Sequence, residues 1–283
     1  MNRISISQAW SYATSFFSGQ GVNHAIALIG VGIIIPLILQ FALGGGAALT
    51  DPMSFASGGG VMAMGGSMIL LGLANYILQT GSFFASWRIG LTHGREPVGA
   101  ALGYGLIAAL PTLLLLIAVV LILVLIAFVL FGSAFTSLAG GNPDPRTAAG
   151  AGVFVLLMIP VFFLFCAWLA GRLSCTGPIM ADRRSYNILS GMADSWRMTG
   201  ASQWKLLGYF VLLFIAAMVI SMILGAIVGV SMFAGGGTPS AGSFVGIAIG
   251  GLLLGVPMAY LQVAIPAGIY RALGSTNQSD IFA

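Results

Sequence analysis

The sequence predicts an all-α polytopic membrane protein with six transmembrane helices in one transmembrane domain over residues 1–283. Of the 283 residues, 59% are hydrophobic and 6% are charged, and the mean hydropathy is +1.06. About a quarter of the residues in a soluble domain are charged, so this chain could not cover a water-facing surface. Because lipid offers backbone groups no hydrogen-bond partner, its long apolar runs are expected to be helices.

Six apolar runs set the expected order of the spans. The segments that join them outside the cell (44–60, 132–152 and 234–242) are rich in Gly, Ser, Ala and Pro. This composition is typical of flexible connections. The expected spans are residues 22–43, 61–85, 106–131, 153–173, 206–232 and 244–265.

The basic residues predict the orientation of the chain. In this topology nine of the ten Lys and Arg residues lie on one side of the membrane, and only Arg146 lies on the other. All five Trp residues also map to the basic side, where indole rings favour the headgroup level. The positive-inside rule therefore predicts that both termini are cytoplasmic. No run of basic residues occurs, which argues against nucleic acid as a partner.

Two segments on the predicted inner side repeat one pattern. TGSFFASWR (80–88) and TGPIMADRR (176–184) both read T-G-x-x-x-A-x-x-R. Interfacial segments are expected over 4–17, 86–105 and 174–205, and the first has the spacing of an amphipathic helix. These features predict three pseudo-repeated units, each with a cytoplasmic-side interfacial helix, an outward span, a loop and an inward span.

The Arg residues of these segments are the candidate contact residues. In the two repeated segments, an Ala three positions before the Arg allows close helix packing, and the Arg then lies at the level of the phosphates. Arg197 is a candidate because it lies in the interfacial segment 174–205. The contacts would be with anionic lipid headgroups or with a partner protein. The candidates are Arg88, Arg184 and Arg197.

Polar side chains inside the spans form a second candidate set. Asn75, Gln79 and Ser82 follow i, i+4 and i+7 and share one face of a helix. They would line a substrate path or form interhelical hydrogen bonds, and we favour the second interpretation. No ionisable residue lies near the centre of a span, which argues against a proton-coupled pump.

Small residues indicate where helices pack closely. The fifth expected span carries Gly225 and Gly229, and the sixth carries Gly246 and Gly250, in small-xxx-small spacing. These glycines predict contact between the two spans, with a second copy of the chain, or with a partner membrane protein.

No catalytic or metal-binding constellation can be assembled from the residues. His24 and His93 lack the spacing of metal ligands, and Cys166 and Cys175 are interpreted as unpaired apolar side chains. No H-E-x-x-H, G-x-S-x-G or P-loop motif occurs. We therefore expect no metal, no cofactor and no enzymatic activity.

The segment GPIMADRRSYNILSGMADSWRMTGASQWKLLGYF (177–210) resembles the bacterial glycerophosphoryl diester phosphodiesterase membrane-domain family and related six-helix inner-membrane proteins. In that family the membrane part can precede a cytoplasmic phosphodiesterase domain. We expect no such domain here, so the resemblance implies a multi-pass protein of the bacterial inner membrane and no phosphodiesterase activity.

Two functions are consistent with these observations. The first is non-enzymatic handling of a membrane lipid or other amphiphile, by transport or as a lipid-binding scaffold. The second is a membrane scaffold or regulatory subunit that acts through a partner protein.

Overall fold

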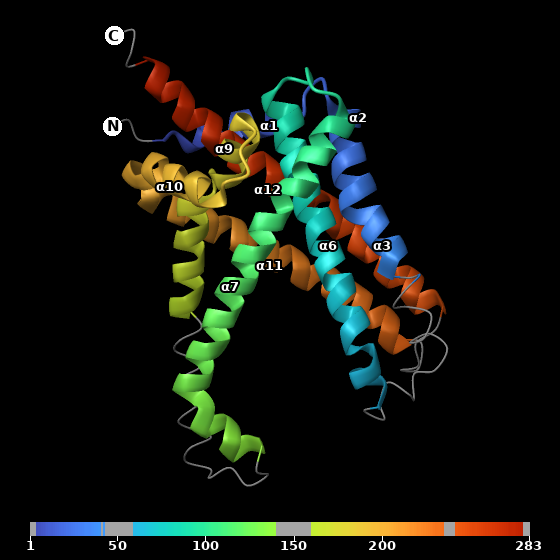
Figure 1. The fold of residues 1–283 in the computed structure, drawn as a ribbon. Coiled ribbons are helices and arrows are strands. Elements are labelled where there is room, and N and C mark those ends of the chain that lie inside the picture. Colours follow the sequence, from blue (N-terminus) through green and yellow to red (C-terminus); the bar gives the residue numbers. More distant parts are fainter. Residues whose placement is uncertain (1–3, 41, 43–58, 140–159, 235–240, 280–283) are drawn as a thin grey trace.

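The computed structural model describes residues 4–40, 42, 59–139, 160–234 and 241–279 (Figure 1). In these ranges the regular elements are all helices, and six of them are long and apolar enough to cross a membrane. The predicted all-helical, multi-pass class is therefore confirmed. The six candidate spans are Gly21–Gln40, Ile69–Leu91, Val98–Ile126, Pro160–Arg183, Ile188–Met222 and Leu252–Gly274.

The first half of the chain contains a short helix and three spans. Helix α1 (Ile6–Ser15) precedes the first span, which is built from α2 (Gly21–Ala25), the π-helix η1 (Ile26–Ile34) and α3 (Ile35–Gln40). The second and third spans lie in two long helices, α6 (Gly59–Leu91) and α7 (Val98–Ala139).

In the second half, two short helices lie where the fourth and fifth candidate spans meet, one at the end of Pro160–Arg183 and one at the start of Ile188–Met222. A helix over 160–173 leads through a turn into α9 (Thr176–Arg183), which is followed by α10 (Ile188–Thr199) and the 3₁₀ turn η3 (Gly200–Ser202). The long helices α11 (Gln203–Ala234) and α12 (Ala241–Ser279) complete the described fold.

Helix α1 lies along α12 with its small residues inward. Ser5 caps its N-terminus by accepting a hydrogen bond from the Gln8 N–H. Ala9 and Ala13 are buried against Gly268 of α12, and a Cβ at Gly268 would overlap with the Ala9 carbonyl oxygen. The close approach of the two backbones therefore requires glycine at this position.

The spacing of segment 4–17 predicts one apolar face at the membrane interface, with Ile6, Trp10, Ala13 and Phe17 on it, and these residues have different surroundings in the structure. Ala13 is buried and Phe17 packs on Tyr260. Ile6 and Trp10 instead remain 40% and 45% exposed. The helix is turned so that its alanines face α12, because only small side chains allow this approach.

The segment 86–105 does not form an interfacial helix of its own. Helix α6 continues to Leu91, a turn with positive φ at His93 and Gly94 follows, and α7 begins at Val98 directly after Pro97. By contrast, 174–205 does contain separate short helices, α9 and α10. The units of the predicted repeat therefore differ, because the second one lacks a separate short helix.

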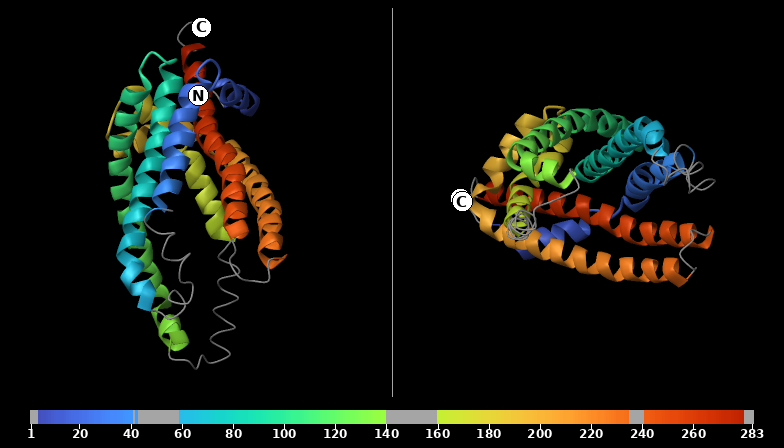
Figure 2. Two further views of the ribbon diagram at one scale, coloured as in Figure 1. Left: turned by 90° about the vertical axis from the view of Figure 1, so that its right-hand side faces the viewer. Right: turned by 90° about the horizontal axis from the view of Figure 1, so that it is seen from below.

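Among the residues whose burial is described, the buried side chains gather at one end of the helix bundle. We call this the polar end, and it carries α1, the α6–α7 turn, α9 and α10 (Figures 1 and 2). Fully buried core residues such as Ile89, Ile179 and Leu206 lie there. Further along the spans, large apolar side chains such as Leu121 and Leu212 are exposed. Apolar exposure on this scale is typical of a surface that faces hydrocarbon.

Candidate functional site

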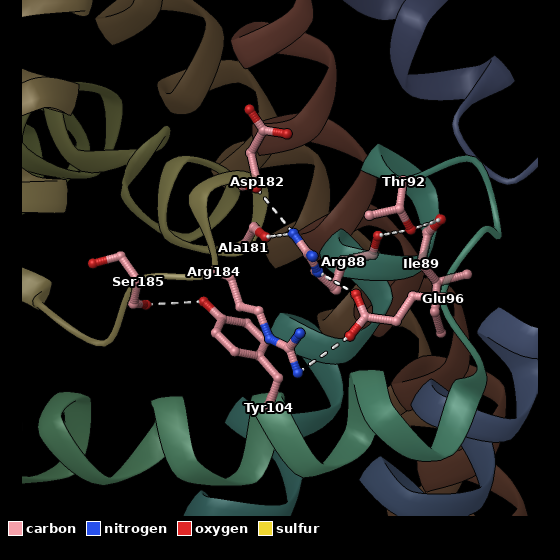
Figure 3. A network of polar contacts seen from close by, with 9 residues as sticks. All are labelled: Arg88, Ile89, Thr92, Glu96, Tyr104, Ala181, Asp182, Arg184 and Ser185. Carbon is pink, nitrogen blue, oxygen red and sulfur yellow. Dashed lines mark hydrogen bonds and ion pairs between the residues drawn. The ribbon is translucent and has the colours of Figure 1, made fainter.

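Arg88 connects α6 to α9 at the polar end (Figure 3). Its Nε lies 2.5 Å from Oε2 of Glu96, and its Nη1 donates to the carbonyl oxygens of Ala181 (2.8 Å) and Asp182 (2.9 Å). Only 14% of the side chain is exposed. The planar guanidinium can satisfy acceptors in different directions at once. Arg88 is therefore a tertiary link as well as a candidate headgroup contact.

Glu96 lies between two arginines. Its Oε1 lies 3.7 Å from Nη2 of Arg184, while its Oε2 pairs with Arg88. Arg184 ends α9 in the left-handed conformation, with φ 52°. This conformation ends the helix and directs the chain toward Ser185. The side chain of Arg184 remains 56% exposed, whereas that of Glu96 is 12% exposed.

Two tyrosines tie the network to other helices. Tyr104 of α7 donates to the carbonyl oxygen of Ser185 at 3.0 Å (Figure 3). Tyr270 of α12 donates to Oδ2 of Asp182 at 2.8 Å. The last turn of α9 and the residue after Arg184 are thus each held by a tyrosine, so the backbone on both sides of Arg184 is tied to other helices.

A polar pocket of about 460 Å³ opens at this network, which we call the basic pocket. Its charged lining consists of three arginines (Arg88, Arg95 and Arg184) and one acid (Glu96), a formal net charge of +2 when His93 is not counted. Arg95 and His93 are exposed. Guanidinium groups bind carboxylate and phosphate oxygens in pairs, so the pocket fits an anionic group. The complete lining is Arg88, Leu91, Thr92, His93, Arg95, Glu96, Pro97, Ala100 and Arg184.

The surface of α10 carries further cations. Asp194 forms ion pairs with Arg183 and with Arg197, and Arg197 is 83% exposed. Trp196 is 39% exposed and Trp204 of α11 is 72% exposed. Arginines and indoles thus lie together at the polar end, a combination typical of the headgroup level of a bilayer.

Arg172 has a different environment from these surface arginines. Its guanidinium lies 4.2 Å from the centre of the Trp196 ring and is almost fully buried. Its carbonyl oxygen accepts hydrogen bonds from Ser195 and Thr199. The sequence places Arg172 with the other inner-side cations, but the structure makes it a packing residue for α10.

The predicted intramembrane polar face is divided. Ser82 is buried and donates to the carbonyl oxygen of Gln79 in its own helix at 2.7 Å, whereas the side chains of Asn75 and Gln79 are exposed. Ser86, which lies on the same face, hydrogen-bonds His24 of the first span. An extension of the i, i+4, i+7 series to i+11 would have found Ser86.

The Ser86–His24 pair resembles a nucleophile and its base, but its surroundings do not suit catalysis. Ser86 Oγ lies 2.6 Å from His24 Nδ1, and both side chains are fully buried. Neither residue lines the basic pocket. The pair is best explained as an interhelical hydrogen bond, the interaction expected for polar residues in these spans.

Several predictions fall on residues whose surroundings lie outside the described part. Gly225 and Gly229 lie in α11, and Gly246 and Gly250 lie in α12, but their packing is not described.

The two cysteines, by contrast, are described. Both are free thiols; Cys166 is exposed and Cys175 is buried. Within the described ranges, no group of three His, Cys, Asp or Glu side chains is placed to hold a metal ion.

Comparisons of the chain with protein-family models, with curated proteins and with solved structures gave no match. The class of the protein is defined by its fold and by the basic pocket. It is a multi-pass helical membrane protein with a cationic pocket at one end of its helix bundle.

Proposed function

We propose that this chain is a non-enzymatic integral membrane protein that binds an anionic membrane lipid or similar amphiphile through the basic pocket. The observation that carries the proposal is the position of three arginines around one acid, at one end of a bundle of six apolar helices. A phosphate group would add the negative charge that balances the net charge of the pocket.

The charge distribution supports a cytoplasmic position for the polar end. By the positive-inside rule, the end that carries Arg95, Arg184 and Arg197 faces the cytoplasm, with both termini on that side of the inner membrane. A basic residue near an anionic membrane surface contributes about 1 kcal/mol of binding free energy. Exposed Trp204 supports this depth because indole rings favour the headgroup region.

The pseudo-repeat also supports a single binding site. Arg88 and Arg184 end the two T-G-x-x-x-A-x-x-R segments, and both lie beside the carboxylate of Glu96. The resemblance to membrane domains of the glycerophosphoryl diester phosphodiesterase family is compatible with a bacterial envelope protein. Lipid transport and lipid-binding scaffolding both require this binding step.

The test compares two double variants of equal charge change. Arg95→Gln with Arg184→Gln removes two cations from the basic pocket, whereas Arg183→Gln with Arg197→Gln removes two exposed cations beside it. Native mass spectrometry would count the anionic phospholipids that remain bound to each purified variant. We expect the pocket variant to lose several-fold more lipid than the control, because Asp194 pairs with both arginines that the control removes. Equal retention by both variants would refute the proposal.

A second candidate function is a scaffold that acts through a partner protein. Its support is the surface around α10, where Leu189 (66%), Trp204 (72%) and Arg197 (83%) are strongly exposed. Native complex size distinguishes the two functions. If the Arg183→Gln, Arg197→Gln variant loses a partner while anionic lipids remain bound, the scaffold function is favoured.

A further inference from the structure

Arg88 has hydrogen-bond donors left after its contacts within the protein. The guanidinium group of an arginine carries five N–H donors. Arg88 uses its Nε for Glu96 and its Nη1 for the carbonyl oxygens of Ala181 and Asp182. Its Nη2 forms no hydrogen bond with the residues that the structure describes. Because Arg88 also lines the basic pocket, these two N–H groups are available to a ligand there.

The other two arginines of the basic pocket are less engaged. Nη2 of Arg184 lies 3.7 Å from Glu96, which is too long for a hydrogen bond. The exposed side chain of Arg95 forms neither an ion pair nor a hydrogen bond within the described part of the chain. Figure 3 shows Arg88 and Arg184 each beside one oxygen of the same carboxylate. Three guanidinium groups with unused donors therefore line one pocket.

Anionic groups differ in the number of oxygens that they present to such donors. A carboxylate and a phosphate diester each present two free oxygens, whereas a terminal phosphate, which is a phosphomonoester, presents three. Guanidinium groups bind these oxygens by charge-assisted hydrogen bonds. A terminal phosphate can therefore give one oxygen to each of the three arginines, and a diester leaves one arginine without an oxygen.

The net charge of the pocket favours the same group. The three arginines and Glu96 give a formal charge of +2. A terminal phosphate carries a charge of about −1.5 to −2 at pH 7, because its second pKa is about 6. A diester or a carboxylate carries a single negative charge and leaves the pocket positive.

We propose that the ligand of the basic pocket carries a terminal phosphate, as phosphatidate does. This inference rests on the proposed function in lipid binding and names the class of headgroup. The position of the pocket at the polar end of the bundle suits a headgroup whose acyl chains lie beside the spans.

A competition between two lipids tests the class of headgroup. The purified protein would receive equal amounts of phosphatidate and phosphatidylglycerol, a diester, with the same acyl chains at pH 8. Native mass spectrometry would count both lipids in one spectrum. We expect bound phosphatidate to exceed bound phosphatidylglycerol by about tenfold, the effect of one additional charge-assisted hydrogen bond. Equal binding, or two phosphatidylglycerols in place of one phosphatidate, would overturn the inference.

The pH dependence of this preference provides a second arm. At pH 5 the terminal phosphate has lost most of its second charge, whereas the diester keeps its single charge and reports changes in the protein. The charged and titratable side chains at the pocket are Arg88, Arg95, Arg184, Glu96 and His93, with Asp182 and Tyr104 beside them.

The pH series would use the His93→Asn variant, so that no histidine of the lining titrates. Asparagine tolerates the positive φ of 53° at this position. We expect the preference for phosphatidate to fall several-fold from pH 8 to pH 5. A preference of the same size at both values would overturn the inference.

The variants that test the proposed function separate the two ways of failing. Arg95→Gln with Arg184→Gln should abolish the preference, and Arg183→Gln with Arg197→Gln should keep it. If the unmodified protein binds both lipids equally and the pocket variant loses both, the proposed function stands and the terminal phosphate is refuted. Equal retention of both lipids by the two variants refutes the proposed function as well.

Inorganic phosphate distinguishes a lipid from a soluble ligand. It presents the same oxygens and charge but has no acyl chains. We expect phosphatidate to remain bound in an excess of inorganic phosphate. Displacement would overturn the assignment to a lipid and would assign the pocket to a soluble phosphomonoester.

Discussion

Arg88 and Arg184 lie beside the two oxygens of a single carboxylate, that of Glu96, at 2.5 and 3.7 Å. The two arginines end matching nine-residue segments that lie 96 residues apart in the sequence (Arg184 minus Arg88). The shared acid holds α6, the α6–α7 turn and the end of α9 together. Its negative charge also lowers the net positive charge of the basic pocket. Glu96 therefore affects both the stability of the polar end and the binding of anions there.

The Glu96→Gln variant should change stability and anion binding in opposite directions. Loss of the carboxylate leaves the partly buried Arg88 without its ion-pair partner, so we expect unfolding in detergent to become easier by about 1–3 kcal/mol. The pocket also becomes more positive, so anionic phospholipid should bind more tightly. Thermal unfolding and lipid-binding titrations would measure the two effects.

Asp194→Asn is the matched control for Glu96→Gln. Asp194 pairs with the exposed Arg183 and Arg197, and exposed ion pairs contribute about 0–1 kcal/mol. A loss of stability in Asp194→Asn that equals the loss in Glu96→Gln would contradict the central position that we assign to Glu96.

Gly268→Ala should loosen α1 from α12. An added Cβ would overlap with the Ala9 carbonyl oxygen and lie 2.8 Å from the Ala13 nitrogen, so the backbone of α1 must shift. Overpacking of this kind costs about 1–3 kcal/mol. Limited proteolysis within residues 4–20 would detect the release of α1.

Gly274→Ala on the same helix provides the comparison, because nothing lies within 4 Å of its added Cβ. We expect its stability to be unchanged or raised by about 0.5–1 kcal/mol, since alanine favours a helix over glycine. Equal proteolysis of α1 in both variants would show that α1 is not docked as described.

Ser86→Ala should destabilise the fold without affecting lipid binding. It removes the 2.6 Å partner of the buried His24 ring, and a buried polar group without its hydrogen bond costs about 1–3 kcal/mol. Bound lipid should not change because Ser86 does not line the basic pocket. A fluorophosphonate probe should not label Ser86, and covalent labelling there would contradict the proposed non-enzymatic function.

The orientation can be tested with one introduced thiol. Ala201→Cys in η3 places an exposed thiol at the polar end, in a Cys166→Ala background that removes the exposed native thiol. A membrane-impermeant maleimide should label it in inverted membrane vesicles and not in intact spheroplasts. Labelling in spheroplasts would contradict a cytoplasmic polar end.

The six spans could be predicted from hydropathy because each one is a continuous apolar run in which lipid requires a helix. The ends of the spans were harder to predict. Helix α6 continues past residue 85 to Leu91, since intrahelical hydrogen bonds and packing on α9 sustain it where apolar composition ends. The turn at His93 and Gly94 then left no room for a separate middle helix.

The site was only partly predictable. Arg88 and Arg184 could be selected because they end a repeated pattern, but nothing local to Glu96 indicates that it joins them. The Ser86–His24 contact spans 62 residues and follows from the packing of α6 on the first span. Gly32 illustrates the same point, since its missing side chain makes room for Ser82 of α6. Such pairings depend on how the helices pack against one another, and the spacing of residues along the sequence does not determine that packing.

Electron cryomicroscopy in nanodiscs that contain anionic phospholipid would test the central claim most directly. The predicted result is phosphate density within hydrogen-bonding distance of Arg95 and Arg184, beside the Arg88–Glu96 pair. A basic pocket that holds only solvent in such nanodiscs, at a resolution that shows ordered lipids elsewhere around the spans, would contradict the claim.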